Sequence, residues 1–249
     1  MKIFSHRGIG FGKEENSVES YKEALKNGFS LEIDVQKSRD DVLVISHDTN
    51  LKRHRGINKN LTEMYSQELQ ELKVPMFREV LEYFKKNKNE EQLLAIHLKD
   101  EYQTGILDLA AELITNQQLE KSCFIFDVTT IGANHLKSLN PKIKVGLSVG
   151  EKRYTGSIYL WKDIKDCLDV DIVWWDEWHS KLYNKEKREL IRGKTIYAIS
   201  PELHKIHNHP KGNSLEDIKY VWKDLIELDV HGICTDYPLE LKKYLESVK

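Results

Sequence analysis

The chain has 249 residues, which is enough for one large domain or two small ones. Lysine and arginine together number 38 and aspartate and glutamate 40, so the formal net charge is −2. This balance argues against a nucleic-acid partner, because nucleic-acid binders usually carry a basic excess or a basic stripe. An anionic substrate would therefore be bound by a few well-placed cationic side chains.

The cysteines and the opening residues indicate a reducing, aqueous setting. Cys123, Cys167 and Cys234 are far apart, lie in or beside apolar runs and form no CxxC motif, so we expect buried thiols and no disulfide framework. The opening MKIFSHRG runs directly into an apparent strand, and no apolar run reaches about 20 residues. We therefore expect a cytoplasmic protein without a membrane span.

Short apolar runs recur along the chain, and amphipathic helical patterns separate them. Eight such alternations predict a parallel sheet, and eight units favour closure into a (β/α)8 TIM barrel. An open doubly wound sheet is the alternative, but no glycine-rich nucleotide-binding turn follows the first strand. The predicted strands are residues 2–6, 30–36, 93–99, 122–127, 144–149, 171–175, 195–200 and 231–235.

The first helix shows the clearest helical signals. Val18, Tyr21, Ala24 and Leu25 share one face, and the pattern ends at Gly28. Asn16 precedes this pattern and is predicted to be the N-cap residue. Similar periodicity follows Thr104 and Ser214.

Two segments interrupt the alternation. Residues 41–48 follow the second strand after too short a gap for a parallel crossover, so they are predicted to form a hairpin partner. Residues 48–90 are then charged and helix-favouring, and we expect a small insertion or cap over part of the barrel mouth. The whole chain, 1–249, is predicted to be a single domain.

Polar residues stand at the predicted carboxyl ends of the strands, where barrel enzymes place their chemistry. Glu32 and Asp34 are two residues apart and share a face, as do His97 and Lys99 on the next barrel strand. Buried charges need partners. A divalent cation would satisfy Glu32, Asp34 and His97, and Lys99 would then face an anion.

Each of these features has an ordinary explanation when it is taken alone. A Glu-x-Asp pair is more often a salt-bridged strand edge than a metal site, and His97 alone is more often a core histidine. Lys99 alone would be a surface lysine, and His47 could cap a turn with Asp48. Their joint occurrence at predicted strand ends favours a functional site.

Several motifs in order resemble the glycerophosphodiester phosphodiesterase family. They span nearly the whole chain, and those in the first fifty residues are specific in type and spacing. In this sequence they are HRG (6–8), the Glu15–Asn16 pair, LEIDV (31–35), VISHDTNLKR (44–53), VPMFREVL (74–81) and GICTDYP (232–238).

This resemblance implies a metal-assisted phosphoric diester hydrolase of lipid metabolism. His6 and His47 match the family's catalytic acid–base pair, and Glu32 and Asp34 match two of its three metal-binding carboxylates. The remaining matches are phosphate-binding Arg7 and Lys99 and supporting Glu15 and Asn16. The implied products are an alcohol and glycerol phosphate, and the implied cofactor is one divalent ion, Mg, Ca, Mn or Zn. The implied partner is a small-molecule phosphodiester.

The sequence departs from the family at IHLK (96–99), where His97 stands in place of a third carboxylate. A Glu/Asp/His set could still bind a cation, with preference moving from Ca or Mg toward Mn, Zn or Fe. Alternatively, metal affinity falls and the chain is a non-catalytic, phosphoester-binding barrel. We favour the first reading, because the other catalytic positions are filled.

The later strand ends suggest where a substrate's alcohol group could bind. A possible substrate rim consists of Trp175, Trp178, Ser200, Glu202 and His204. Tryptophans at such spacing are more often core residues, and at least one must be. A phospholipase D-like enzyme that removes lipid head groups is a further alternative function.

Overall fold

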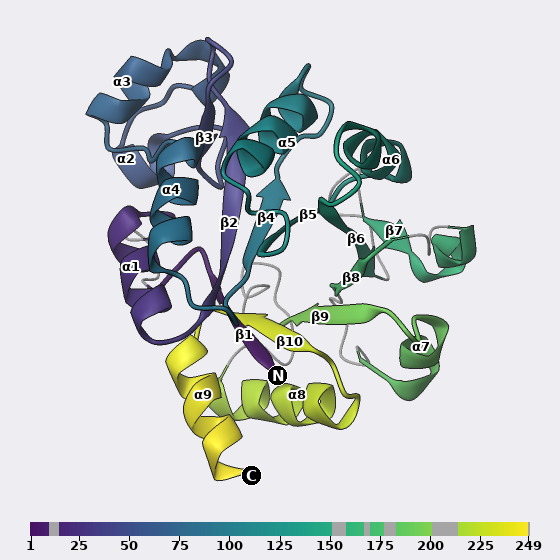
Figure 1. Ribbon diagram of the computed structural model, residues 1–249. Coiled ribbons are helices and arrows are strands. Elements are labelled where there is room, and N and C mark those ends of the chain that lie inside the picture. The colour runs from purple at the N-terminus through teal and green to yellow at the C-terminus, as the bar shows by residue number, and fades with distance from the viewer. Residues whose placement is uncertain (10–14, 151–157, 167–169, 177–182, 201–213, 249) are drawn as a thin grey trace.

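The computed structural model describes residues 1–9, 15–150, 158–166, 170–176, 183–200 and 214–248, and its strands form a closed barrel. Eight parallel strands pair in sequence around the barrel, and β1 pairs with both β10 and β2 to close it (Figure 1). This arrangement confirms the predicted (β/α)8 fold. The barrel strands are β1 (Lys2–His6), β2 (Ser30–Lys37), β4 (Leu94–Leu98), β5 (Cys123–Phe126), β6 (Lys144–Gly150), β8 (Ile172–Trp175), β9 (Thr195–Ile199) and β10 (Gly232–Thr235).

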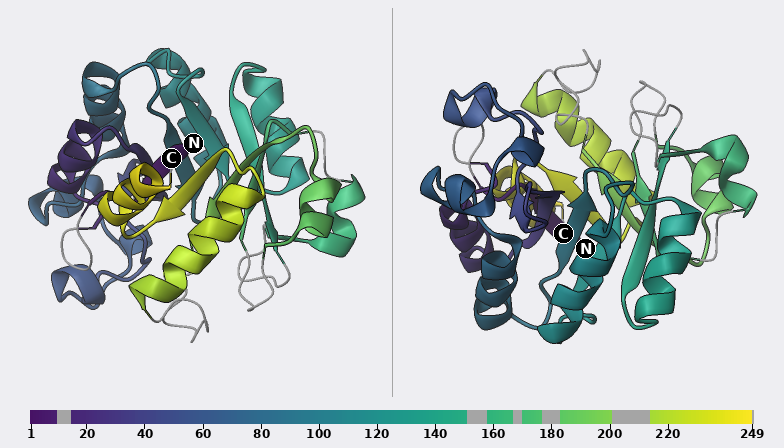
Figure 2. Two further views of the ribbon diagram at one scale, coloured as in Figure 1. Left: turned by 90° about the horizontal axis from the view of Figure 1, so that it is seen from below. Right: turned by 90° about the horizontal axis from the view of Figure 1, so that it is seen from above.

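Helices surround the strands on the outside, as the two turned views show (Figure 2). Within the described part of the chain, every helix is too short or too polar to cross a membrane. A short strand, β7 (Tyr159–Leu160), and the 3-10 helix η2 (Trp161–Asp166) follow β6. The outer helices are α1 (Val18–Lys26), α4 (Phe77–Asn87), α5 (Ile106–Asn116), α6 (Thr130–Leu139), α7 (Lys185–Leu190), α8 (Leu215–Glu227) and α9 (Pro238–Ser247).

Strand alternation separates the helix-facing core from the barrel interior. In β2, Ile33 and Val35 belong to the apolar cluster shared with α1 and α4, so Glu32 and Asp34 face the interior. The interior also holds a mainly aromatic layer that includes Phe4, Ala95 and Cys234. Each of these three lies two residues before a polar residue at a strand's carboxyl end. The layer therefore forms a packed floor beneath the polar groups.

The predicted hairpin and insertion are both present. Strand β3 (Leu43–Ile45) pairs antiparallel with β2, and α2 (Lys52–Arg55), η1 (Leu61–Glu63) and α3 (Ser66–Glu71) follow it. Figure 1 shows β3, α2 and α3 gathered beside one end of β2. They enclose a separate small core made of Val44, Leu51, Leu61, Met64, Leu69, Val74 and Met76.

Residues 77–87 were expected within this insertion, but they form α4 as a regular outer helix of the barrel. Phe77, Leu81 and Phe84 of α4 are fully buried in the main helix-facing core with residues of β2 and β4. The segment with its own core therefore ends before α4.

Candidate active site

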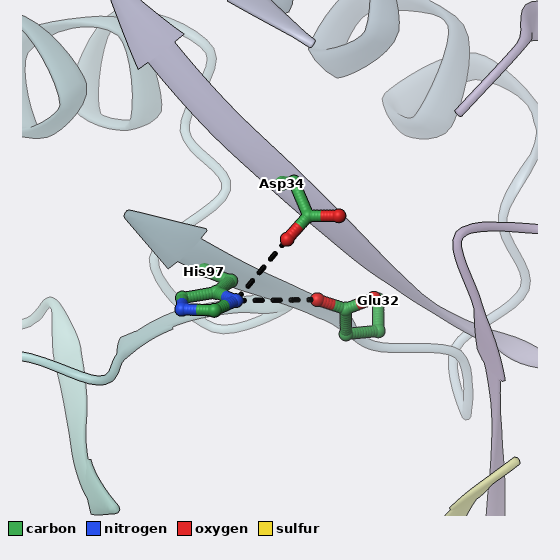
Figure 3. Close-up of side chains that lie close together, drawn as sticks. All are labelled: Glu32, Asp34 and His97. Carbon is green, nitrogen blue, oxygen red and sulfur yellow. Dashed lines mark ion pairs between the residues drawn. The ribbon is translucent and has the colours of Figure 1, made fainter. Parts of the chain in front are cut away.

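Three side chains that the sequence singled out as metal ligands meet inside the barrel. One atom from each of Glu32, Asp34 and His97 lies within 4.8 Å of the others. His97 Nδ1 is 3.1 Å from Asp34 Oδ1 and 3.9 Å from Glu32 Oε1, and Figure 3 shows this nitrogen facing both carboxylates. The parallel register of β2 and β4 places Asp34 opposite His97 and so brings the three together.

The chemistry of this cluster fits a divalent cation. Both carboxylates are almost fully buried, and Asp34 Oδ1 accepts no well-aligned hydrogen bond from the described residues. Burial and the neighbouring charge of Asp34 raise the pKa of Glu32. Two oxygen ligands and one imidazole nitrogen form a donor set that several divalent metals accept. A bound cation would satisfy Asp34 Oδ1 and compensate both carboxylates.

Two basic side chains border the same cluster. Arg7 Nε lies 3.0 Å from Asp34 Oδ2 and its Nη1 lies 3.1 Å from Glu15 Oε1, while Lys99 Nζ lies 3.6 Å from Asp34 Oδ1. Burial alone would raise the pKa of Asp34, but Lys99 and Arg7 outweigh burial and hold that pKa well below its usual range. Asp34 is thus ionised at neutral pH and ready to bind a cation.

Arg7 reaches the cluster because of an unusual backbone turn after β1. Arg7 has φ 56° and Gly8 has φ 84°, and a Cβ atom on Gly8 would lie 2.3 Å from Ser20 Oγ. Only glycine therefore permits this close approach of α1 to the end of β1. Burial alone would lower the pKa of Arg7, but the negative charges of Asp34 and Glu15 outweigh burial and raise this pKa.

The prediction that Asn16 caps the first helix was wrong. Ser17 is the N-cap of α1, and its side chain accepts a hydrogen bond from the backbone N–H of Ser20. Asn16 has φ 53° and donates from Nδ2 to Asp34 Oδ2 at 3.0 Å, while its Oδ1 accepts from the hydroxyl of Tyr21 at 2.6 Å. Asn16 therefore supports Asp34, and Tyr21 is a site residue that sequence reasoning missed.

Each of the two predicted catalytic histidines is held by an aspartate. His6 Nδ1 lies 2.7 Å from Asp236 Oδ1, and His6 Nε2 lies 3.8 Å from Glu32 Oε2. His47 Nδ1 lies 2.6 Å from Asp48 Oδ1. Because each aspartate accepts a hydrogen bond from Nδ1–H, Nε2 of each ring is left for acid–base chemistry.

Burial lowers the pKa of His47, and although Asp34 and Asp48 oppose this effect, Lys99 and Arg7 reinforce it. The neutral imidazole is therefore favoured at neutral pH. Such a ring can accept a proton, which is what a general base must do.

The insertion contributes two residues that sequence reasoning did not assign. Arg53 Nη2 and His54 Nε2 lie 2.7 and 3.0 Å from Glu15 Oε1, and Arg53 also donates to Asp48. These contacts connect α2 to the carboxylates that hold Arg7 and His47. Arg53 lay within the quoted VISHDTNLKR motif, but only the folded chain brings it to Glu15.

The structure does not bring the described members of the predicted substrate rim to the mouth. Trp175 is fully buried on the outer face of β8, where its ring packs against Trp161 and Tyr183. Ser200 is also fully buried, and its Oγ accepts a hydrogen bond from Trp222 Nε1 of α8 at 2.8 Å. Both predictions were wrong, because these side chains point toward the helices. The other three members, Trp178, Glu202 and His204, lie outside the described residues.

Comparisons with known proteins agree on one family. The sequence profile of the Glycerophosphoryl diester phosphodiesterase family matches residues 6–162. A glycerophosphodiester phosphodiesterase of Bacillus altitudinis is 23% identical over 100% of this chain and 99% of its own. A lysophospholipase D of Mus musculus is 34% identical over 34% of this chain, but the match spans only 24% of the mouse protein.

Solved structures share the same fold. A glycerophosphoryl diester phosphodiesterase of Parabacteroides distasonis aligns with a TM-score of 0.74 at 21% identity, over 99% of this chain and 86% of its own. A phosphodiesterase of Oleispira antarctica, solved with its product sn-glycerol-3-phosphate, aligns with a TM-score of 0.74 at 19% identity, over 99% of this chain and 97% of its own.

Proposed function

Because this chain belongs to the glycerophosphoryl diester phosphodiesterase family, we propose that it hydrolyses a glycerophosphodiester to an alcohol and glycerol phosphate. The observation that carries this proposal is the convergence of acid–base and anion-binding groups on one cluster. His6 lies 3.8 Å from Glu32, and Arg7 and Lys99 lie within 3.6 Å of Asp34. Phosphodiester hydrolysis needs these types of group together.

In the proposed reaction the histidines move the protons. His47, whose pKa burial lowers, removes a proton from the attacking hydroxyl or water. His6, held between Asp236 and Glu32, gives a proton to the leaving alcohol oxygen. If the attacking group is a neighbouring hydroxyl of the glycerol, a cyclic phosphate forms first, and water opens it with the two roles exchanged.

The cationic side chains bind the phosphate in this scheme. Arg7 presents a planar guanidinium that suits two phosphate oxygens, and Lys99 adds a second positive charge. Glu32, Asp34 and His97 would hold one divalent cation. When bound, the cation would help to stabilise negative charge on the non-bridging phosphate oxygens. Glu15 and Asn16 keep Arg7 and Asp34 in place.

A second candidate is a lysophospholipase D activity, in which the diester carries an acyl chain. The observation that favours it is the 34% identity to the mouse lysophospholipase D over 85 residues. Because that match spans only 24% of the mouse protein, the substrate of the relative is a weak guide. We favour the water-soluble diester, because the relative aligned over its full length is a glycerophosphodiester phosphodiesterase.

Parallel assays on glycerophosphocholine and lysophosphatidylcholine test these proposals. Release of glycerol phosphate from glycerophosphocholine, lost in His6→Ala, supports the first candidate. Preferential cleavage of lysophosphatidylcholine supports the second. If the protein binds glycerol phosphate but cleaves neither diester, it is a non-catalytic phosphoester-binding barrel, and the proposed function is wrong.

A further inference from the structure

We propose that Asp127 is a positioning residue that makes His97 a metal ligand. Asp127 holds the proton of His97 on Nε2, so that Nδ1 offers its lone pair beside Glu32 and Asp34. The inference rests on the proposed cation-assisted function and concerns the position where this chain departs from the family. It defines the site as two carboxylates and one oriented imidazole.

His97 lies between carboxylates on two sides. Its Nε2 is 3.0 Å from Asp127 Oδ2, and its Nδ1 is 3.1 Å from Asp34 Oδ1. An ionised carboxylate only accepts hydrogen bonds, so the contact with Asp127 requires a proton on Nε2. Without a cation, the contact with ionised Asp34 requires a second proton on Nδ1; a cation that binds there displaces this proton and leaves the lone pair on Nδ1. A divalent cation is the partner that satisfies this lone pair and both neighbouring carboxylates.

Stacking also fixes the orientation of the His97 ring plane. The β4–β5 register places His97 opposite Phe126, whose ring stacks on the imidazole with centroids 5.1 Å apart and planes 30° apart. Phe126 in turn stacks on Trp174, with centroids 4.1 Å apart. Packing and the Asp127 contact therefore fix both the plane and the edge that faces Glu32 and Asp34.

Asp127 occupies an unusual backbone position. It directly follows β5, and its φ of 61° lies in the left-handed region, which few residues other than glycine adopt. Such conformations persist where the surrounding structure requires them, and they cluster at functional sites. The turn after β5 is the position from which the carboxylate meets His97 on the neighbouring strand.

The contact between Asp127 and His97 determines how strongly, and which, metal ions the site binds when His97 replaces a carboxylate. Metal-bound histidines usually donate their second N–H to a carboxylate, and loss of that partner typically weakens metal binding about 10- to 100-fold. Imidazole nitrogen is a better ligand for zinc and iron than for calcium or magnesium. The Asp127–His97 pair therefore retains a cation site and shifts its selectivity toward transition metals.

The test uses the whole 249-residue chain, ¹⁵N-labelled at histidine, with Mn²⁺ as the probe. Pulsed EPR of bound Mn²⁺ should detect coupling to one histidine nitrogen. His97→Glu should keep Mn²⁺ binding but lose this coupling. Asp127→Asn should weaken Mn²⁺ binding about 10- to 100-fold. Asp108→Asn is the matched control, because Asp108 pairs with His135 at 3.2 Å on the outer helices, and it should bind Mn²⁺ as the wild type does.

Long-range ¹H–¹⁵N NMR of the Zn²⁺ complex provides a second measurement that needs no variant at Asp127. It should show His97 protonated on Nε2 alone. Bound Mn²⁺ without nitrogen coupling in the wild type, or a His97 ring that keeps both protons with Zn²⁺ present, would overturn the inference. Hydrolysis without nitrogen coupling would refute this inference alone, whereas nitrogen-coupled Mn²⁺ without hydrolysis would refute the proposed function alone.

Discussion

Replacing Asp236 by asparagine tests the role proposed for His6. His6 Nδ1 lies 2.7 Å from Asp236 Oδ1, and the opposite ring nitrogen faces Glu32. A hydrogen bond to a charged group contributes about 1.5–3 kcal/mol. Each ~1.36 kcal/mol changes a rate tenfold. We therefore expect kcat/KM for glycerophosphocholine to fall about 10- to 160-fold in Asp236→Asn.

The assay compares two leaving groups. Glycerophosphocholine releases an alkoxide that must be protonated, whereas a p-nitrophenyl diester releases a phenolate that needs little protonation. If His6 is the acid, the loss in Asp236→Asn should be large on the first substrate and small on the second. Asp108→Asn serves as a control for a remote aspartate–histidine pair and should change neither rate. An equal loss on both substrates, or no loss, would refute the role of Asp236 in positioning a proton donor.

Three further results follow from the site. Arg7→Lys loses one of the two charge-assisted hydrogen bonds that the guanidinium can give to the phosphate, so kcat/KM should fall about 10- to 160-fold, measured by steady-state kinetics with thermal melting as the folding control. Tyr21→Phe leaves Asn16 Oδ1 without the 2.6 Å hydrogen bond from the hydroxyl and should lower the free energy of unfolding by about 1–3 kcal/mol in urea denaturation; unchanged stability would contradict this. Burial lowers the pKa of His47, so the acidic limb of kcat/KM against pH should lie below the ordinary value of 6.5. Because Asp48 raises this pKa, Asp48→Asn should move the limb to still lower pH, and a shift to higher pH would contradict the base role.

The sequence was most informative where polar residues occupy alternate positions of a predicted apolar strand. Glu32 and Asp34 interrupt an otherwise apolar strand at alternate positions, so their common face could be predicted from spacing alone. All eight predicted barrel strands are present. The motifs around His6 and His47 indicated the catalytic pair, although they did not show that Asp236 and Asp48 hold the rings.

The errors and omissions arose where side-chain direction depends on packing. Both faces of β8 are apolar, so spacing could not show that Trp174 faces the barrel interior and Trp175 the helices. The error about Ser200 has the same cause, because its hydrogen-bond partner Trp222 lies on a helix that is distant in the sequence. Asp127 reaches His97 only through the β4–β5 register, which is not evident in one sequence.

The most direct test of the central claim is hydrolysis of glycerophosphocholine after chelation, followed by addition of Mg²⁺, Ca²⁺, Mn²⁺ and Zn²⁺ one at a time. The account predicts that chelation abolishes release of glycerol phosphate, that at least one cation restores it, and that no cation restores it in His6→Ala. Full activity in the chelated protein, or restored activity in His6→Ala, would contradict a cation-assisted reaction that depends on His6.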